Sequence, residues 1–255
     1  MYRMIVRKTP EQVEKMAASG DVLVRCLKML AAKVRAGITT EELDAAAEKF
    51  IRSQGAVPSF KGYRGFPGSI CASPNSMVVH GIPGPYELKR GDILSIDVGV
   101  TKDGWVANAA MTVPVGAVAP EAEKLLEVTR SSLFTGVEQM RPGNHLGDVS
   151  AAIQAAVERE GLSIIRTLVG HGIGREMHEE PQVPNFGEPG KGPELEEGMV
   201  LAIEPMVNVG GPLVRMDDDG WAVYSEDDSL AAHFEFTVAV TADGPRILTP
   251  WHEDG

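Results

Sequence analysis

An internal repeat is the sequence feature that most constrains the fold of this chain. Asp97 and Glu204 each end a similar segment, in which a glycine is followed by an apolar run and then by the carboxylate. Upstream of each segment lies an arginine two residues before a glycine, Gly37 in the first copy and Gly143 in the second. The separation is 60 residues from Gly37 to Asp97 and 61 residues from Gly143 to Glu204. The repeat predicts two similar half-domains, at about 10–115 and 120–245.

The repeat also predicts where chemistry takes place. A histidine-containing segment ending in proline precedes each carboxylate, at His80 in the first copy and at His178 in the second. Duplicated halves that face each other bring equivalent strands together, so Asp97 and Glu204 are expected to meet at the shared axis. Two carboxylates in one site repel each other unless protons or cations intervene. We therefore expect a divalent metal between the halves, which together form a single catalytic domain over residues 1–255.

Local signals predict helices followed by strands in each half, and hence an α+β fold. Thr9 before Pro10, with Gln12 three residues later, is a capping box at the start of a helix. A second capping box, Thr39 with Glu42, begins a helix that is expected to end near Gly55. The matching helices of the second half are expected at 120–140 and 146–160. Apolar runs predict strands at 92–100, 105–115, 164–169, 199–208 and 232–241, with a hairpin turn at 101–104.

Composition excludes several classes of protein. The net charge of −12 argues against phosphate binding, because affinity for nucleic acid depends mainly on Lys and Arg. No apolar run is long enough for a membrane helix, and no secretory signal is visible. Two cysteines, Cys26 and Cys71, are too few for a disulfide framework, which indicates a reducing, cytoplasmic setting. We expect no direct contact with nucleic acid or membrane.

Two histidines and several carboxylates are the candidate metal ligands. His171 and His178 lie in a glycine-rich segment, whereas Asp97 and Glu204 lie within apolar strands, where a buried acid needs a partner. Glu235 lies in a further apolar strand. Oxygen and nitrogen ligands favour Mn, Fe, Co or Zn, and one or two ions are expected. The spacing differs from both the H-E-x-x-H motif and the cysteine-based zinc motifs.

At these segments the chain resembles the type I methionine aminopeptidases, in the short bacterial form. The matching segments are 58–83, 91–100, 170–181, 203–206 and 219–221, and the resemblance covers nearly the whole chain. The resemblance implies the pita-bread fold of creatinases and aminopeptidases, with two halves related by a pseudo-twofold axis. It also implies that the protein acts as a monomer and removes the N-terminal methionine of nascent polypeptides.

The resemblance also implies roles for individual residues. The implied metal ligands are Asp97, Asn108, His171, Glu204 and Glu235. Glu204, His178 and His80 match catalytic positions, with Glu204 as the general base and the histidines holding the substrate and the tetrahedral intermediate. The implied methionine pocket and substrate contacts are His80, Tyr63, Phe66, Cys71, Met177 and Trp221, where Met177 replaces the usual phenylalanine.

The chain departs from the family pattern around the metal site. Asn108 stands where the family has a bridging aspartate, and an amide offers only one neutral oxygen ligand. Val106 and Ala107 replace the family's histidine and glycine, while His233 replaces a glutamine and Phe236 a histidine. Because these changes are clustered, they favour natural divergence over a single engineered substitution. The total charge of the carboxylate ligands is −3, against −4 with the bridging aspartate. Binding of a second ion is therefore expected to be weakened most.

Three hypotheses follow from these departures. In the first, the chain is a peptidase with one tightly bound ion and reduced activity. In the second, it is a diverged pseudo-enzyme or a repurposed enzyme that binds a peptide or another small substrate in the same cleft. In the third, His233 compensates as a metal ligand, since it lies two residues before Glu235 on the same strand face; its alternative role is to replace the glutamine beside the ligands. A proline dipeptidase or creatinase is a further alternative, although those relatives usually carry an additional N-terminal domain.

Overall fold

The computed structural model describes residues 4–253. Four helices and one short 3-10 turn account for its helical part: α1 (Pro10–Lys33), α2 (Thr40–Ser53), η1 (Tyr63–Gly65), α3 (Pro120–Val137) and α4 (Leu146–Arg159). All four helices lie where the sequence predicts them. No helix among the described residues is long and apolar enough to cross a membrane.

Both predicted capping boxes are present. The backbone N–H of Gln12 donates to the side chain of Thr9 at 3.3 Å, and the backbone N–H of Thr9 donates to the side chain of Gln12 at 3.0 Å. Thr39 and Glu42 make the same reciprocal pair at 3.2 and 2.8 Å. Each pair satisfies two backbone N–H groups that the first turn of a helix otherwise leaves without partners.

The strands form antiparallel sheets in both halves. In the first half, β4 (Ile93–Lys102) pairs along its whole length with β5 (Trp105–Pro114), and successive parts of its other edge pair with β2 (Ile70–Pro74) and β1 (Val57–Pro58). In the second half the order is β15 (Gly244–Ile247), β14 (Phe236–Thr241), β9 (Val200–Ile203), β7 (Gly170–Gly172) and β8 (Glu179–Val183). Two smaller sheets consist of β13 (Ala231–His233), β10 (Met206–Asn208) and β6 (Ser163–Ile164), and of β11 (Val214–Met216), β12 (Val223–Ser225) and β3 (Met77–Val79).

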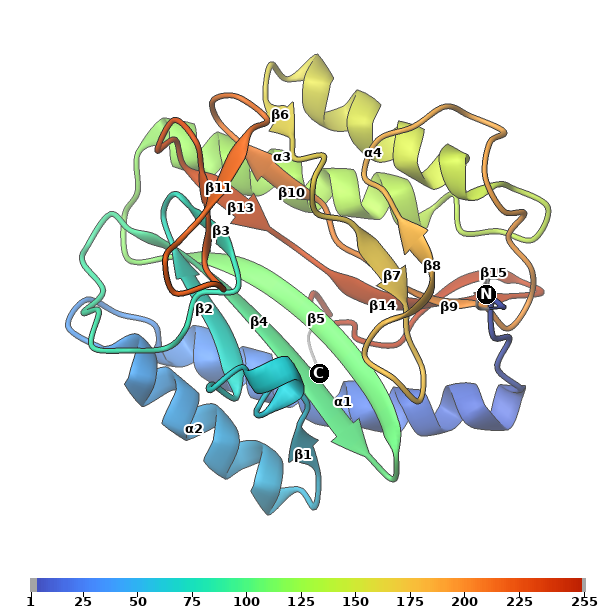
Figure 1. Cartoon of the computed structure of the whole chain (residues 1–255), viewed down its shortest axis with the longest axis horizontal. Helices are drawn as coiled ribbons and strands as arrows, with labels where there is room; N and C mark the ends of the chain where they lie inside the picture. The colour runs from blue at the N-terminus through green and yellow to red at the C-terminus, as the bar shows by residue number, and fades with distance from the viewer. Residues whose placement is uncertain (1–3, 254–255) are drawn as a thin grey trace.

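The helices lie outside the strands, as Figure 1 shows. Helix α1 contacts β4 and β5, while α3 contacts β9, β10 and β13 of the other half. A continuous apolar core joins the two sets, because it includes Leu27 of α1, Ile96 of β4, Leu133 of α3 and Phe236 of β14. The long β4–β5 hairpin and the broken strands of the second half therefore share one apolar interior.

The hairpin turn is shorter than the predicted segment 101–104. Strand β4 continues to Lys102 and β5 begins at Trp105, so only Asp103 and Gly104 form the turn. Both residues have positive φ, 51° and 73°, which matches the twist of a two-residue antiparallel hairpin.

Three predicted strands differ from the structure. The prediction of a strand at 164–169 is wrong beyond Ile164, because residues 165–169 cross from β6 to β7 outside any ladder. The expected strand 199–208 is broken into β9 and β10 at Glu204 and Pro205, where proline lacks a backbone N–H for a ladder. The expected strand 232–241 is broken into β13 and β14 at Phe234 and Glu235. Both breaks coincide with carboxylates that the sequence nominates as metal ligands.

Candidate metal centre and substrate cavity

The strand breaks and the hairpin bring the acidic residues to one place. Asp97 lies on β4 opposite Ala110 of β5, and Asn108 lies on β5 opposite Gly99. Glu235 lies at the break between β13 and β14, and its backbone N–H donates to the C=O of Ala110 on β5 at 2.9 Å. This bond links the two halves directly beside the carboxylates.

Three predicted ligands converge closely enough to hold an ion. The donor atoms of His171, Glu204 and Glu235 all lie within 4.8 Å of one another. Nε2 of His171 lies 3.6 Å from Oε1 of Glu204. Glu235 is 1% exposed, and its Oε1 has no hydrogen-bond partner among the described residues. A buried carboxylate oxygen without a donor is the kind of atom that a cation satisfies, so these residues fit a divalent metal.

His233 contacts this group from one side. Its Nε2 atom lies 3.6 Å from Oε2 of Glu204 and has no hydrogen-bond partner among the described residues. Burial lowers the pKa of His233, and the charge of Asp97 opposes that shift. The neutral imidazole therefore faces the second oxygen of Glu204, while His171 faces the first.

Asn108 lies between the remaining carboxylates. Its side-chain nitrogen Nδ2 donates to Oδ1 of Asp97 at 2.7 Å and to Oε2 of Glu235 at 2.7 Å. Asn108 is therefore close to the other predicted ligands, but it presents its amide hydrogens to them.

Burial shapes the electrostatics of this centre. It raises the pKa of Asp97 to about 6, and the charge of Glu204 adds to the shift, which His233 and Asn108 oppose. It raises the pKa of Glu204 to about 7, against the opposing effect of His171. The pKa of Glu235 is raised well above its usual value by burial and then by the charges of Glu204 and Asp97. Without a cation, the acidic cluster therefore retains protons near neutral pH.

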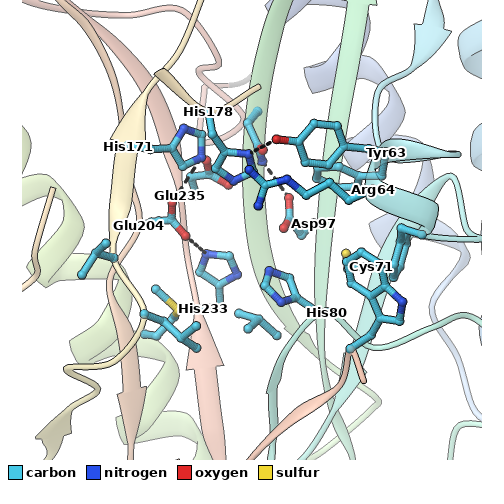
Figure 2. Close-up of a pocket in the computed structure, with 18 of the residues that line it drawn as sticks. Tyr63, Arg64, Cys71, His80, Asp97, His171, His178, Glu204, His233 and Glu235 are labelled. Atoms are coloured by element: carbon cyan, nitrogen blue, oxygen red, sulfur yellow. Dashed lines mark hydrogen bonds and ion pairs between the residues drawn. The ribbon is translucent and has the colours of Figure 1, made fainter. Parts of the chain in front are cut away.

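Two further histidines face the same space (Figure 2). Burial lowers the pKa of His178 to about 3 and that of His80 to about 4, with smaller contributions from nearby cationic or imidazole groups. Both rings are therefore neutral at physiological pH. The hydroxyl of Tyr63 lies 2.7 Å from Nδ1 of His178, and the Tyr63 and His178 rings are stacked.

A cavity of about 300 Å³ contains these groups. Of the residues predicted for substrate binding, Tyr63, Phe66, Cys71, His80 and Trp221 line it. The rings of Phe66 and Trp221 meet edge to face, with their centroids 5.1 Å apart. Met177 does not line the cavity, but it is buried in the apolar cluster that contains the lining residues Phe60, Phe66 and Cys71.

Sequence reasoning missed several residues of the cavity wall: Phe60, Arg64, Val79, Thr167, Leu168, Val169 and Met206. Most are apolar residues without a chemical signature. Arg64 differs, because a cation next to Tyr63 in the predicted pocket segment was a visible signal.

Comparison with known proteins gives the same assignment. Residues 14–242 match the model of metallopeptidase family M24. A methionine aminopeptidase of Clostridium perfringens is 53% identical over 96% of this chain and 99% of its own length. The crystal structure of methionine aminopeptidase from Rickettsia prowazekii superposes with a TM-score of 0.95, at 41% identity, covering 96% of this chain and all of that one.

A more distant likeness supports the fold alone. Prolidase from Pyrococcus furiosus superposes with a TM-score of 0.79 at 22% identity, and the match covers 96% of this chain but only 65% of that chain. The α+β architecture is thus the pita-bread fold that methionine aminopeptidases share with prolidases. On the match to the family model and the full-length identity to its relatives, the chain belongs to metallopeptidase family M24, among the type I methionine aminopeptidases.

Proposed function

We propose that this protein removes the N-terminal methionine from nascent polypeptides in a metal-dependent reaction. The observation that carries the proposal is the convergence of His171, Glu204 and Glu235 at a cavity with an apolar wall. Mn, Fe, Co and Zn all suit this set of one imidazole and two carboxylates. When bound, the ion would polarise the scissile carbonyl and promote ionisation of the attacking water.

The cavity wall suits a methionine side chain. Phe66 and Trp221 offer aromatic edges and faces to a flexible thioether, and Cys71 adds a small polarisable group. Sulfur–aromatic contacts of this kind contribute about 0.3–1.5 kcal/mol each. Phe60 adds a further apolar surface in the same lining.

The polar residues can orient the peptide and move its protons. When the hydroxyl of Tyr63 donates to Nδ1 of His178, the neutral ring carries its proton on Nε2. His178 can then donate to a substrate oxygen and stabilise developing negative charge, and His80 would act with it from the other side of the cavity. Glu204 would accept a proton as the general base.

A second function is a peptide-binding protein or repurposed enzyme that does not cleave methionine efficiently. Asn108 is the observation that favours it, since its amide hydrogens point at two carboxylates that would otherwise bind ions. The cavity and its apolar wall would bind the same class of peptide in either case.

We propose further that the two halves form one catalytic domain and that the protein acts as a monomer in the cytoplasm. The shared apolar core and the buried free thiols of Cys26 and Cys71 support this proposal. The net charge of −12 gives no support for direct contact with ribosomal RNA. Light scattering after size-exclusion chromatography would measure the molar mass, and a stable dimer would contradict the monomer.

Release of free methionine tests the function. The purified protein would be loaded separately with Mn, Co, Fe or Zn and incubated with a Met-Ala-Ser peptide, and a Leu-Ala-Ser peptide would serve as the control. We expect methionine release with at least one ion and little leucine release. Methionine release by the Asn108→Asp variant but not by the unchanged protein would favour the alternative in which the natural chain does not cleave methionine. If neither the unchanged protein nor Asn108→Asp releases methionine with any of the ions, the proposed peptidase activity is rejected.

A further inference from the structure

The amide of Asn108 serves two carboxylates at once. Its Nδ2 atom lies 2.7 Å from Oδ1 of Asp97 and 2.7 Å from Oε2 of Glu235, and Asn108 is only 4% exposed. An ionised carboxylate only accepts hydrogen bonds, and the two hydrogens of an amide are both on its nitrogen. One NH₂ group therefore satisfies both acids.

This arrangement separates the two oxygens of Glu235. Oε2 receives the hydrogen bond from Asn108, whereas Oε1 is buried and has no hydrogen-bond partner among the described residues. The group of mutually close donor atoms comprises His171, Glu204 and Glu235, and Asp97 is not part of it. A cation between Asp97 and Glu235 would meet the positive end of the amide dipole.

We propose that this centre holds a single divalent ion, bound by His171, Glu204 and Oε1 of Glu235. The amide of Asn108 takes the place of a second cation and holds Asp97 by a hydrogen bond, so Asp97 is not a ligand. Three protein ligands leave coordination positions for water and substrate, as in other catalytic metal sites. This inference deepens the proposed function and rests on its metal dependence.

The sign of the residual charge supports the same stoichiometry. Asp97, Glu204 and Glu235 bring three negative charges when they are ionised, so one divalent ion would leave a net charge of −1 and two would leave +1. A residual negative charge is met by the amide hydrogens of Asn108, which face Asp97 and Glu235. A residual positive charge would face the same hydrogens without a compensating acceptor, and burial penalises such a charge.

Metal stoichiometry tests the inference directly. The metal-free protein, the Asn108→Asp variant and the Asn108→Ala variant would be titrated with Mn(II), with bound metal measured by equilibrium dialysis and electron paramagnetic resonance. We expect one bound ion with an isolated-ion spectrum in the unchanged protein. Asn108→Asp should bind two ions with an exchange-coupled spectrum. Asn108→Ala removes the hydrogen bonds without adding a charged ligand, so it should still bind one ion.

A second variant tests the place given to Asp97. In the unchanged protein, Asp97→Asn should alter the affinity for Mn(II) less than roughly tenfold, the equivalent of about 1.4 kcal/mol. In the Asn108→Asp background, the same change should abolish binding of the second ion. Circular dichroism would verify that each variant is folded.

Three results would overturn the inference: two ions of similar affinity in the unchanged protein, loss of the only ion in Asp97→Asn, or no second ion in Asn108→Asp. These outcomes are independent of methionine release. Absence of release would reject the proposed function and leave the measured stoichiometry in place.

Discussion

The hydroxyl of Thr237 binds both backbone groups of Asn108. It accepts a hydrogen bond from the N–H of Asn108 at 3.0 Å and donates one to its C=O at 2.7 Å. Thr112 does the same for His233, at 2.9 Å in both directions. In the first half Thr112 follows Asn108 by four positions, and in the second half Thr237 follows His233 by four. Each threonine binds the site residue of the other half, so the two contacts repeat the pseudo-twofold relation at the metal centre.

Replacing Thr237 with valine should destabilise the protein. The substitution keeps the shape of the side chain but leaves a buried N–H and C=O of Asn108 without partners, at an expected cost of about 2–4 kcal/mol in the free energy of unfolding. Urea denaturation would measure the change. Thr237→Ser keeps the hydroxyl and should recover most of it, and Thr112→Val should cost a similar amount. A loss in Thr237→Val no larger than that in Thr237→Ser would contradict the role of the hydroxyl.

Without metal, the stability of the folded protein should decrease as the pH rises towards neutrality. The pKa values of Asp97 and Glu204 are about 6 and about 7 in the folded metal-free protein, above the unfolded values of about 4. The folded state then binds more protons than the unfolded state, so its stability is lost as the pH rises through these values. We expect the Tm of metal-free protein to fall between about pH 4 and about pH 7.

A divalent ion should oppose this trend, because its ligands must be deprotonated and binding therefore strengthens as the pH rises. Calorimetry with and without Mn(II) would compare the two states. A Tm of the metal-free protein that rises over the same interval would show that the buried acids are ionised without metal.

Tyr63→Phe should impair the orientation of His178. The variant removes the hydroxyl that lies 2.7 Å from Nδ1 of His178 but retains the stacked ring. A single neutral hydrogen bond corresponds to about a twofold to tenfold loss in kcat/KM. Tyr86→Phe is the matched control, because the Tyr86 hydroxyl binds Asp92 and Tyr86 does not line the cavity. Equal losses in the two variants would exclude a specific role for Tyr63.

His233→Gln separates the two roles considered for His233. Its Nε2 atom lies 3.6 Å from Oε2 of Glu204, whereas the three-ligand group does not include it. We therefore expect metal affinity to change less than roughly tenfold in both His233→Gln and His233→Ala. Isothermal titration with Mn(II) would measure this affinity. Loss of the ion in His233→Ala would instead establish the compensation hypothesis, in which His233 is a ligand.

Arg64 should influence which peptides are preferred. The side chain is exposed, lines the cavity and stacks over the ring of Tyr63, with its guanidinium carbon 5.3 Å from the centroid. A peptide leaving the centre past Tyr63 and His178 would meet this cation. Arg64→Glu should lower the preference for Asp over Lys at the third peptide position roughly twofold to fivefold, as exposed ion pairs are weak. Arg64→Lys should preserve the preference, and an unchanged ratio in Arg64→Glu would remove Arg64 from substrate selection.

The elements of the fold that the sequence predicted depend on short-range chemistry. Thr9 and Thr39 cap their helices through residues three positions away, and Asp103-Gly104 turns the hairpin through its own backbone angles. The repeat of Asp97 and Glu204 also predicted that two strands would carry equivalent acids. At Pro205 the apolar strand is broken by the missing N–H of proline, which is visible in the sequence. At Glu235 the break accompanies a hydrogen bond to Ala110 of the other half, and periodicity gave no sign of it.

By itself, then, the sequence determined the helices, the hairpin, the family and the identity of the acidic residues, because these follow from neighbouring side chains or from recurring motifs. The tertiary structure decided which atoms face one another. Asn108 meets Asp97, 11 residues away, and Glu235, 127 residues away. The donors available to each buried carboxylate depend on that meeting, so the direction of the Asn108 amide, and with it the number of ions, is a property of the folded chain alone.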